Sequence, residues 1–470
     1  MLARDGVFDV AIVGAGVTGL VAGRELARRS VRVALIEKWP DVGGQASAFD
    51  LGGGVFLERY YHHLFESDSD IISLHEELLP GRLEWRRSNV GMYANGRIWP
   101  FVSPLDLLRY GPLPLVDRIR FGLATLLLMS RVDWERMDEI AAVDWLRRVC
   151  GDRALTAVWR PLLFGKFGAD ADTVPLAWMW SKLTARRRLR GRGAGEERLG
   201  YPRDSFQPLA RKLRQEIESL GGRVFVDRPV LSLERRDGVF RLPTASSGAF
   251  RLPRASWQAD GDDVLARSVV LTTAMHAART LFPWPHAYAS ALAEWRYRTA
   301  VVLLLELRRP LSSTYWLNIA DPEIPFLGLI EHTNFVPAAR YPARYAYVSN
   351  YVASEHPLTR LSTEELLARF LPGLRRIAPG LRDDDIQRRW SFREDAAQPV
   401  PRLGMKRRLL AFDTPIGGIF LANTTQIYPE DRGTNYSVRL GRRVADHVDA
   451  WFTARGLPRT GCAAPRGPRT

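Results

Sequence analysis

Hydrophobic positions divide the chain into strand-like and helix-like stretches that alternate near the N-terminus. Apolar runs at Phe8–Val13 and Val31–Glu37 predict two buried strands, with a helical stretch between them. A strand, helix, strand order of this kind is typical of a parallel α/β sheet. Later runs of the same buried or alternating type predict further strands at Val90–Tyr93, Val230–Glu234, Ser268–Thr273, Ala300–Glu306, Tyr345–Ser349 and Gly418–Ala422.

Apolar residues at helical spacing predict a mostly helical region over residues 104–190, including Ile119–Met129. Phe206–Leu220 is predicted to be an amphipathic helix, which ends at the glycine pair 221–222. Ser362–Ile377 and Val438–Phe452 follow the same periodicity. The middle of the chain therefore differs in character from both ends.

Composition and charge narrow the class of protein. The 470 residues contain 46% hydrophobic and 25% charged residues, which is ordinary for a globular protein of more than one domain. The net charge of +15 includes five arginines between residues 186 and 192. An anionic membrane surface, an anionic substrate and a merely solvated loop all stay open as explanations. A nucleic-acid partner is not expected, because no nucleic-acid-binding module is recognisable.

Cysteines and apolar runs bear on the protein's environment. The two cysteines, Cys150 and Cys462, form no C-x-x-C pair, so neither a disulfide framework nor a metal site is expected. No signal peptide is visible, which favours a cytoplasmic protein. The run Phe121–Ser130 is far shorter than the roughly 18–20 residues that span a bilayer. Peripheral attachment to the inner face of the membrane remains an alternative, and the oligomeric state stays open.

The turn after the first strand carries the clearest motif. Gly14, Gly16 and Gly19 form a G-x-G-x-x-G pattern between a strand and a helix, and Glu37 ends the next strand 18 residues after Gly19. In this pattern the first glycine permits a tight turn, the second admits a pyrophosphate and the third lets helix and strand approach. Val17 and Thr18 would offer backbone N–H groups at the helix N-terminus. Glu37 is placed to accept hydrogen bonds from a ribose hydroxyl, so the sequence predicts dinucleotide binding.

Residues after the second strand carry a family resemblance. Glu37-Lys38-Trp39-Pro40-Asp41-Val42-Gly43-Gly44-Gln45 resembles the glutathione-reductase-type FAD fold of the flavin amine oxidases, protoporphyrinogen oxidases, phytoene desaturases and UDP-galactopyranose mutases. The resemblance implies that Gly43 and Gly44 lie under the FAD pyrophosphate. Gln45 stands where relatives often have an arginine, and Lys38 follows the ribose-binding acid.

Two later segments extend this resemblance to the flavin family. The stretch 206–230 resembles the segment whose valine contacts adenine, which makes Val230 the candidate. Gly418-Ile419-Phe420-Leu421-Ala422-Asn423 resembles the C-terminal strand that ends at the flavin ribityl chain, with Asn423 at a position that is often acidic. A final helix beginning near Asn435 would point its N-terminus at the flavin and stabilise negative charge there. The cofactor implied is noncovalent FAD.

The expected architecture is an α/β fold. A Rossmann-like FAD-binding domain of the glutathione-reductase type is interleaved with an α+β substrate domain and a helical region. The FAD-binding parts are expected at residues 1–100, 201–280 and 401–455. The other expected parts are a helical, substrate- or membrane-facing region at 101–200, the substrate-domain strands at 281–400 and a disordered tail at 456–470.

Three other stretches resemble UDP-galactopyranose mutases. They are Arg59–Asp68, in which His63 matches a histidine beside the flavin, the strand pair Tyr93–Phe101, and Pro325–Phe335. In the mutases the last of these carries an arginine that binds the substrate pyrophosphate, and Gly328 stands at that position here. The expectation is therefore that the mutase reaction is not catalysed. Val158–Gly168 with Leu176 resembles protoporphyrinogen oxidases instead.

A polar stretch before the last helix supplies the other catalytic candidates. The resemblance places residues 423–436 at the flavin, and within them Tyr428, Asp431, Arg432 and Asn435 join His63 as candidate active-site residues. A capped turn with a surface ion pair is the alternative explanation of this stretch.

The resemblance implies an FAD-dependent oxidoreductase of the oxidase, dehydrogenase or desaturase type, with hydride transfer to flavin N5. Its small-molecule substrate would be amphipathic or anionic, and a lipid-linked one stays open. A redox-neutral, mutase-like enzyme acting on a nucleotide sugar and a non-catalytic FAD-bound partner protein are the two alternatives.

Overall fold

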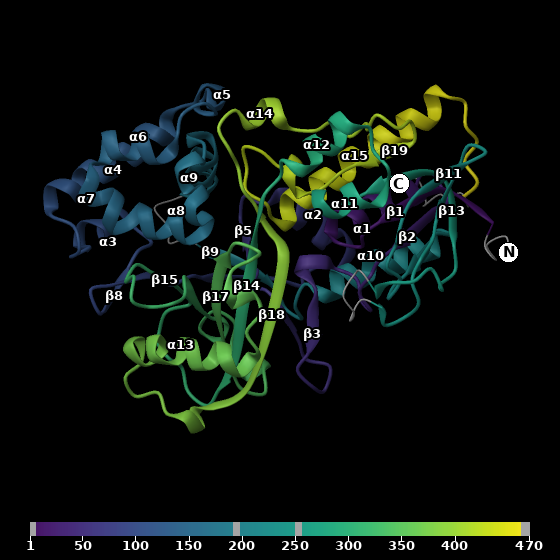
Figure 1. The fold of residues 1–470 in the computed structure, drawn as a ribbon. Helices are drawn as coiled ribbons and strands as arrows, with labels where there is room; N and C mark the ends of the chain where they lie inside the picture. The colour runs from purple at the N-terminus through teal and green to yellow at the C-terminus, as the bar shows by residue number, and fades with distance from the viewer. Residues whose placement is uncertain (1–5, 191–197, 250–255, 462–470) are drawn as a thin grey trace.

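The protein consists of three parts, which a computed structural model describes for residues 6–190, 198–249 and 256–461 (Figure 1). A sheet with helices on both faces lies on the right of the view and holds both chain ends. A second, longer-stranded sheet with α13 lies below it, and a helical region lies at the upper left. The expected α/β fold is thus confirmed.

The first sheet, here called the nucleotide sheet, has parallel strands at its centre. β1 pairs in parallel with β2 and β13, and β13 pairs in parallel with β19. Its strands are β1 (Val7–Val13), β2 (Val33–Ile36), β10 (Arg223–Phe225), β11 (Glu234–Arg236), β12 (Val239–Leu242), β13 (Val264–Leu271) and β19 (Ile419–Leu421). The expected strand Val230–Glu234 is wrong, because Val230 makes only an isolated bridge to Thr244 and the strand begins at Glu234.

Helices cover both faces of the nucleotide sheet because its strands are apolar on both sides. Val10 and Ile12 contribute to one core with the first group of helices, while Phe8 and Ala11 contribute to another with the second group. The first group is α1 (Val17–Ala27), α2 (Ser69–Leu78), α10 (Gln207–Ser219) and α15 (Thr434–Ala454). The second group is α11 (Met275–Leu281) and α12 (His286–Ala293).

The second sheet, here called the long sheet, is antiparallel except where β15 meets β7. Its order is β18 (Ile386–Pro399), β14 (Tyr297–Leu307), β17 (Arg344–Val352), β16 (Gly328–Glu331), β15 (Trp316–Ile319), β7 (Val90–Ala94) and β8 (Arg97–Pro100). Helix α13 (Thr363–Ile377) packs on one face through Leu366 and Phe370. The other face, including Tyr345 and Tyr347, joins the core of the nucleotide part.

Two small sheets connect these parts. β3 (Ala48–Asp50) pairs with β4 (Phe56–Glu58), and β9 (Arg198–Pro202) lies between β5 (Leu64–Phe65) and β6 (Leu83–Arg87). Glu58 ends β4 in a fully buried position between the two larger sheets. Its carboxylate accepts from the Tyr201 hydroxyl at 2.5 Å and from the Phe206 N–H at 2.7 Å. Burial raises the pKa of Glu58 to about 7, against these two hydrogen bonds.

The helical region has a core of its own, to which Phe121, Val158 and Trp178 contribute. It comprises α3 (Pro104–Arg109), α4 (Leu115–Ser130), α5 (Trp134–Met137), α6 (Ala142–Cys150), α7 (Asp152–Ala154), α8 (Arg160–Phe167) and α9 (Leu176–Arg190). Cys150 is a free thiol buried in this core. In the described part of the chain, no helix is both long and apolar enough to cross a bilayer.

Polar contacts join the helical region to the rest of the molecule. Asp138, which is 3% exposed, accepts from the Tyr428 hydroxyl and from the backbone N–H of Lys406 in α14 (Met405–Arg408). Arg298 of β14 donates to the Phe167 carbonyl and to the Asp170 carboxylate. These buried contacts fix the position of the helices relative to both sheets.

Two features predicted from the sequence lie partly outside the described residues, namely the tail at 456–470 and the arginine run at 186–192. Residues 456–461 make ordered contacts, since Thr460 donates to the Asp9 carboxylate and Gly461 donates to the Ser30 carbonyl. The rest of the expected disordered tail, with Cys462, lies outside the described residues. The arginine run at 186–192 lies outside them too, apart from the helical path of α9 to Arg190.

Candidate functional site

The carboxyl ends of three parallel strands meet at one edge of the nucleotide sheet. There β1 leads into the Gly14–Gly19 turn, β13 into Thr272 and Thr273, and β19 into Asn423. In open α/β sheets this edge is where ligands bind. The predicted dinucleotide motif thus lies beside the C-terminal segment that resembles a flavin contact.

Gly14 and Gly19 form a turn in which neither position can carry a side chain. Gly14 has φ +108°, and a Cβ there would lie 2.7 Å from Thr272 Oγ1. A Cβ on Gly19 would lie 2.0 Å from the Gly14 carbonyl oxygen, so helix α1 sits directly against the turn. The Thr272 hydroxyl closes the turn by bonding to the Val13 and Gly14 carbonyls.

Gly16 is different, because it faces open space. It caps α1 with no side-chain hydrogen bond, and the nearest atom to a Cβ at this position would be Gly44 Cα at 3.9 Å. Gly43 bridges to Gly16, and Gly44 has φ +58° and approaches so closely that a Cβ would lie 2.8 Å from Gly16 Cα. The first N–H groups of α1, at Val17 and Thr18, therefore face a cradle made of glycine backbone, which suits a pyrophosphate.

Glu37 lies at the end of β2, next to this cradle. Its carboxylate accepts from the Ala15 N–H at 2.7 Å and from the Trp39 N–H at 3.0 Å. Burial raises the pKa of Glu37, and the two N–H groups act against that shift. Each carboxylate oxygen retains a lone pair for a ribose hydroxyl. The Lys38 ammonium lies 5.4 Å from the centre of the Trp39 ring.

The adenine candidate, Val230, lies beyond Glu37. The backbone of Arg228 donates to the Glu37 carbonyl, and Glu37 donates to Phe225, so this segment runs along the end of β2. Val230 itself is buried and bridged to Thr244. On the other side of the cradle, the Gln45 amide donates to the Ala396 carbonyl of β18 at 3.0 Å and so ties the Gly43–Gly44 loop to the long sheet.

Asn423 uses its side chain within the protein. Its Nδ2 donates to the Thr273 carbonyl at 2.8 Å, and its Oδ1 accepts from the backbone and hydroxyl of Thr425. It thereby fastens the end of β19 to the loop after β13. This shapes the edge of the sheet, and the backbone N–H and carbonyl of Asn423 are themselves bonded to Gln426.

Helix α15 brings a second helix N-terminus to the cradle. A Cβ on Gly441 would lie 2.7 Å from the Thr18 carbonyl, so α15 lies almost in backbone contact with α1, and the Thr18 hydroxyl donates to the Ser437 carbonyl. The N-cap of α15 is Gly433, again with no side-chain hydrogen bond. Two uncapped helix N-termini side by side favour bound negative charge.

Asp431 is a buried carboxylate at the centre of an ionic cluster. Its Oδ2 lies 2.6 Å from Lys166 Nζ of α8 and 2.6 Å from Lys182 Nζ of α9, and its Oδ1 accepts from Gln398 at 3.0 Å. Burial opposes its ionisation, but the two lysines and Arg432 outweigh that effect and hold the pKa of Asp431 well below its usual range. Two further carboxyl groups border this cluster, since Asp68 lies within electrostatic reach of Lys182 and Glu394 within reach of Arg432.

Arg432 is directed at the long sheet. Its Nη2 donates to the Tyr351 hydroxyl of β17 at 2.7 Å. The half-buried Tyr61 lies within electrostatic reach of Tyr351 and Arg432, and its ring packs edge-on against Trp316 at 4.8 Å. An aromatic wall thus lies beside the positive cluster.

Two histidines lie in this wall. His63 Nδ1 lies 3.1 Å from the Tyr315 hydroxyl, and its ring packs against Phe65 and Trp316. His62 donates from Nδ1 to the Tyr60 carbonyl at 2.6 Å. Burial, together with the nearby Arg432 charge, lowers the pKa of His62 to about 4. His62 is therefore neutral at pH 7 and a weak base.

The remaining candidates point elsewhere. Asn435 Oδ1 accepts from the backbone N–H groups of Asp70 and Ile71, and so caps helix α2. The Tyr428 hydroxyl donates to Asp138 of the helical region. The five catalytic candidates therefore do not converge on one point. Asp431 and Arg432 lie together, His63 lies along the aromatic wall, and Tyr428 and Asn435 make structural contacts.

Sequence reasoning missed the partners of Asp431 and Arg432. Lys166 lies 265 residues from Asp431 in sequence, and Tyr351 lies 81 residues from Arg432. No local motif marks Lys166, Lys182 or Tyr351. An alignment that paired these positions could have found them.

Comparison with known families identifies the arrangement. The model described as flavin containing amine oxidoreductase matches residues 17–449. The chain belongs to this family. It is thus an FAD-dependent oxidoreductase by family, as the resemblance in its sequence implied, and its cofactor is FAD.

Relatives of known name match only part of this chain. A carotenoid phi-ring synthase of Streptomyces griseus is 32% identical over 161 residues, which are 30% of this chain and 31% of that protein. A probable zeta-carotene desaturase of Synechococcus elongatus is 26% identical over 189 residues, which are 35% of this chain and 39% of that protein. The matches span about a third of the relatives' length.

Solved structures share the fold over nearly the whole chain. A putative protoporphyrinogen oxidase from Exiguobacterium sp. 255-15 is 18% identical, with TM-score 0.73, covering 96% of this chain and 100% of that chain. A reduced UDP-galactopyranose mutase is 15% identical, with TM-score 0.72, covering 95% of each chain. Putrescine oxidase bound to putrescine is 18% identical, with TM-score 0.66, covering 94% and 99%. At these identities the likeness shows the fold alone.

Proposed function

We propose that this family member dehydrogenates an apolar or amphipathic, lipid-like substrate, in the manner of a desaturase. The observation that carries the proposal is the aromatic wall of Tyr61, His63 and Trp316 beside the positive cluster of Lys166, Lys182 and Arg432. Apolar rings suit a hydrophobic chain such as a polyene, and the neighbouring cations suit the polar end of an amphipathic substrate. The names of the carotenoid-modifying relatives support the same substrate class.

The chain's residues fit FAD. The uncapped N-termini of α1 and α15 and the glycine cradle of Gly16, Gly43 and Gly44 match a pyrophosphate, and Glu37 matches an adenosine ribose. When bound, FAD supplies the two-electron acceptor that takes a hydride from the substrate.

The residues beside the cofactor site have the properties that hydride removal requires. With FAD bound, Arg432 and the α15 N-terminus would provide positive potential that favours negative charge on the cofactor. His62, neutral at pH 7, adds no charge to an apolar binding surface. Desaturation removes a hydride from one carbon and a proton from its neighbour. Loss of the hydride makes that proton acidic, so solvent water can accept it and the weakly basic His62 is not needed as the base.

The test is reductive titration of the purified, FAD-loaded protein under anaerobic conditions. A polyene such as zeta-carotene, dispersed in detergent, is expected to bleach the flavin absorption and to yield a more conjugated product. Arg432→Gln is expected to slow this bleaching about 10²-fold, because a preorganised charge is lost. Lys212→Met, on the outer helix α10, is the matched control and should leave the rate unchanged.

Absence of bleaching by polyenes and by other long-chain lipids would contradict the proposal. Reduction by a simple amine instead would assign an amine-oxidase activity. A flavin that no compound reduces would favour the non-catalytic alternative.

The mutase-like alternative has less support. Gly328 is buried in β16, where a Cβ would already lie 3.2 Å from Ser349 Oγ, so the pyrophosphate-binding arginine of the mutases has no counterpart there. Arg298 cannot take over as a pyrophosphate anchor, because it is buried and bonded to Phe167 and Asp170. Conversion of UDP-galactopyranose to the furanose by the dithionite-reduced protein would restore this alternative.

A lipid-like substrate also favours a cytoplasmic enzyme attached to the inner face of the membrane. We include this location in the proposal as an expectation that fractionation of cells can test. His63, Asp431 and Arg432 remain the proposed active-site residues, and the FAD contacts remain those named at the cradle.

A further inference from the structure

Exposed apolar side chains are concentrated on one part of the helical region. In the described part of the chain, the large apolar side chains that are at least 40% exposed all lie between Leu105 and Ile140. Most of them belong to α4 and are 44–76% exposed, namely Leu115, Val116, Ile119, Leu123, Leu126 and Leu127. Globular monomers rarely expose a contiguous apolar patch of this kind without using it.

Helix α4 is apolar on two opposite faces. At 3.6 residues per turn, its six exposed apolar residues fall within about 120° of the helix circumference. The buried residues Phe121, Ala124 and Leu128 lie on the opposite side and pack into the helical core. Only one of the two apolar faces therefore has a partner within the described residues.

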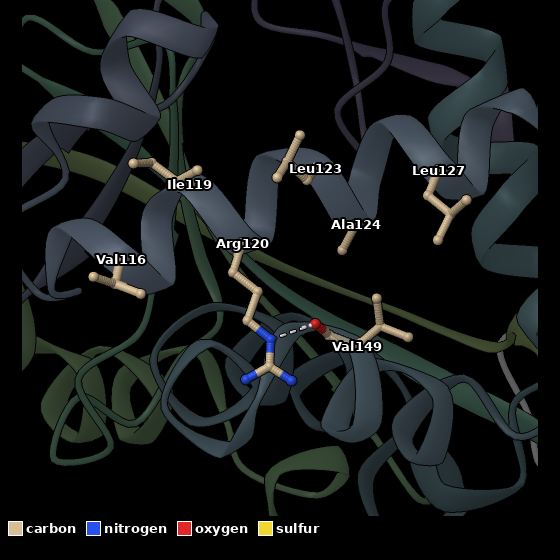
Figure 2. Close-up of a pocket in the computed structure, with 7 residues that line it drawn as sticks. All are labelled: Val116, Ile119, Arg120, Leu123, Ala124, Leu127 and Val149. Atoms are coloured by element: carbon tan, nitrogen blue, oxygen red, sulfur yellow. Dashed lines mark hydrogen bonds between the residues drawn. The ribbon is translucent and has the colours of Figure 1, made fainter.

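The exposed face forms an open groove with the end of α6. Figure 2 shows α4 side chains, among them Ile119, Leu123 and Leu127, along this groove, with Val149 on its far side. The groove has a volume of about 520 Å³. Helices α4 and α6, which line the groove, lie at the upper left of Figure 1, away from the nucleotide sheet.

Arginines flank the apolar face on both sides. On the helix circumference Arg120 lies about 20° beyond one edge of the exposed arc and Arg118 about 60° beyond the other. Arg120 donates to the Arg148 and Val149 carbonyls, and Arg118 donates to the Leu108 and Leu113 carbonyls, so neither charge is neutralised by these bonds. The acids nearby are engaged elsewhere. Asp117 faces Arg153 at 3.7 Å, and Asp106 caps α3.

We propose that the exposed face of α4, with the adjoining end of α3, docks on the surface of an anionic phospholipid bilayer. An apolar helix face with arginines at its borders fits the boundary between acyl chains and negative headgroups. The helix is 16 residues, or about 24 Å, long and would lie flat in this boundary. This docking is inferred from the exposed face of α4 and its arginines, and it does not depend on the proposed reaction.

The test is co-sedimentation of the full-length, FAD-loaded protein with vesicles. One set contains phosphatidylcholine alone, and the other also contains phosphatidylglycerol. The wild-type protein is expected to bind the anionic vesicles, and more weakly as salt is raised. Ile119→Glu combined with Leu123→Glu is expected to weaken binding about ten-fold or more, because two apolar contacts are replaced by repelled charges.

The matched control places two new carboxylates elsewhere. Gln215→Glu combined with Gln387→Glu changes exposed residues of α10 and β18 by the same charge. This control should bind vesicles as the wild-type protein does. The flavin spectrum and melting temperature of each variant report whether it has folded, and hence separate a folding defect from lost docking.

Equal binding of the α4 double variant and the control would overturn the proposal, as would equal binding to neutral and anionic vesicles or no binding at all. A dimer that the α4 variant dissociates, with no attachment to vesicles, would assign the surface to self-association instead.

Discussion

Glu58 shows how a single buried carboxylate couples stability to pH. It lies among tyrosines between the two larger sheets, and burial raises its pKa from 4.5 to about 7. The folded protein therefore binds this proton more tightly than the unfolded chain does. The stabilisation is fully present below pH 4.5 and is lost as the pH rises through 7.

We predict that Glu58→Gln removes this pH dependence. The glutamine can accept from the Phe206 N–H and donate to the Tyr201 hydroxyl, as the protonated acid does. Between pH 4.5 and pH 8 the wild-type protein should lose about 3 kcal/mol of unfolding free energy that the variant does not lose. The difference in unfolding free energy, variant minus wild type, should therefore rise by that amount. Urea denaturation across this range measures the difference. Glu355→Gln, at an exposed site, serves as the control, and a constant difference between Glu58→Gln and wild type would refute the prediction.

Some residues of the candidate site can be predicted from the sequence, and others cannot. Gly14, Gly16, Gly19 and Glu37 act through backbone geometry within one βαβ unit, so their spacing alone identified them. Asp431 and Arg432 are candidate active-site residues only because they follow the last strand of the sequence pattern. Their partners Lys166 and Tyr351 come from other parts of the chain, and no local pattern encodes such tertiary contacts.

At the scale of elements, the cradle joins two loops that need glycine for different reasons. Gly19 and Gly44 have no room for a Cβ, whereas Gly16 has room but faces the place proposed for the pyrophosphate. Substitution at Gly16 therefore separates cofactor binding from folding.

We predict that Gly16→Val folds but loses FAD. The backbone of Gly16 has φ −69°, which any residue adopts, so the valine side chain conflicts with the ligand and not with the protein. The ratio of flavin to protein absorbance should fall at least ten-fold, while the circular dichroism spectrum keeps its shape. Gly417→Ala, where a Cβ would meet nothing within 4 Å, is the control. Full FAD occupancy in Gly16→Val would mean that the pyrophosphate lies elsewhere.

The sequence predicts helices and strands well where the spacing of apolar residues marks the buried positions clearly. Residues 268–271 of the buried strand predicted at 268–273 lie in β13, parallel to β1, while Thr272 and Thr273 follow the end of the strand. Helix α4 was predicted from its apolar spacing, but a helix with two apolar faces does not reveal which face is covered. The strand expected at Val230–Glu234 failed because its apolar residues serve a connection that packs on the sheet edge.

For the whole molecule, the helical region depends on a few buried polar contacts to the FAD-binding part. Asp138 receives hydrogen bonds from Lys406 and Tyr428, which belong to segments near the C-terminus. Lys166 and Lys182 reach Asp431 from the same region. A shift of these helices would therefore move the lysines that hold Asp431 and so change the proposed active site.

We predict that Asp138→Ala destabilises the protein by about 3 kcal/mol, because a hydroxyl and a backbone N–H lose their buried acceptor. Hydrogen exchange should quicken in Met405–Arg408 while β1 and β2 stay protected. Asp144→Ala removes an exposed pair with Arg147 and should cost less than about 1 kcal/mol. Unchanged exchange in α14 would show that Asp138 does not hold the two parts together.

The nucleotide sheet has a consequence for biogenesis. Its strands are drawn from both ends of the chain, with β1 at Val7–Val13 and β19 at Ile419–Leu421, and α15 covers α1 only from residue 434 onward. A nascent chain that has emerged as far as β13 has the glycine turn but lacks the second helix N-terminus. The pair of helix N-termini at the proposed cradle is thus complete only after synthesis has passed residue 434, so capture of FAD by both of them is a late step of biogenesis.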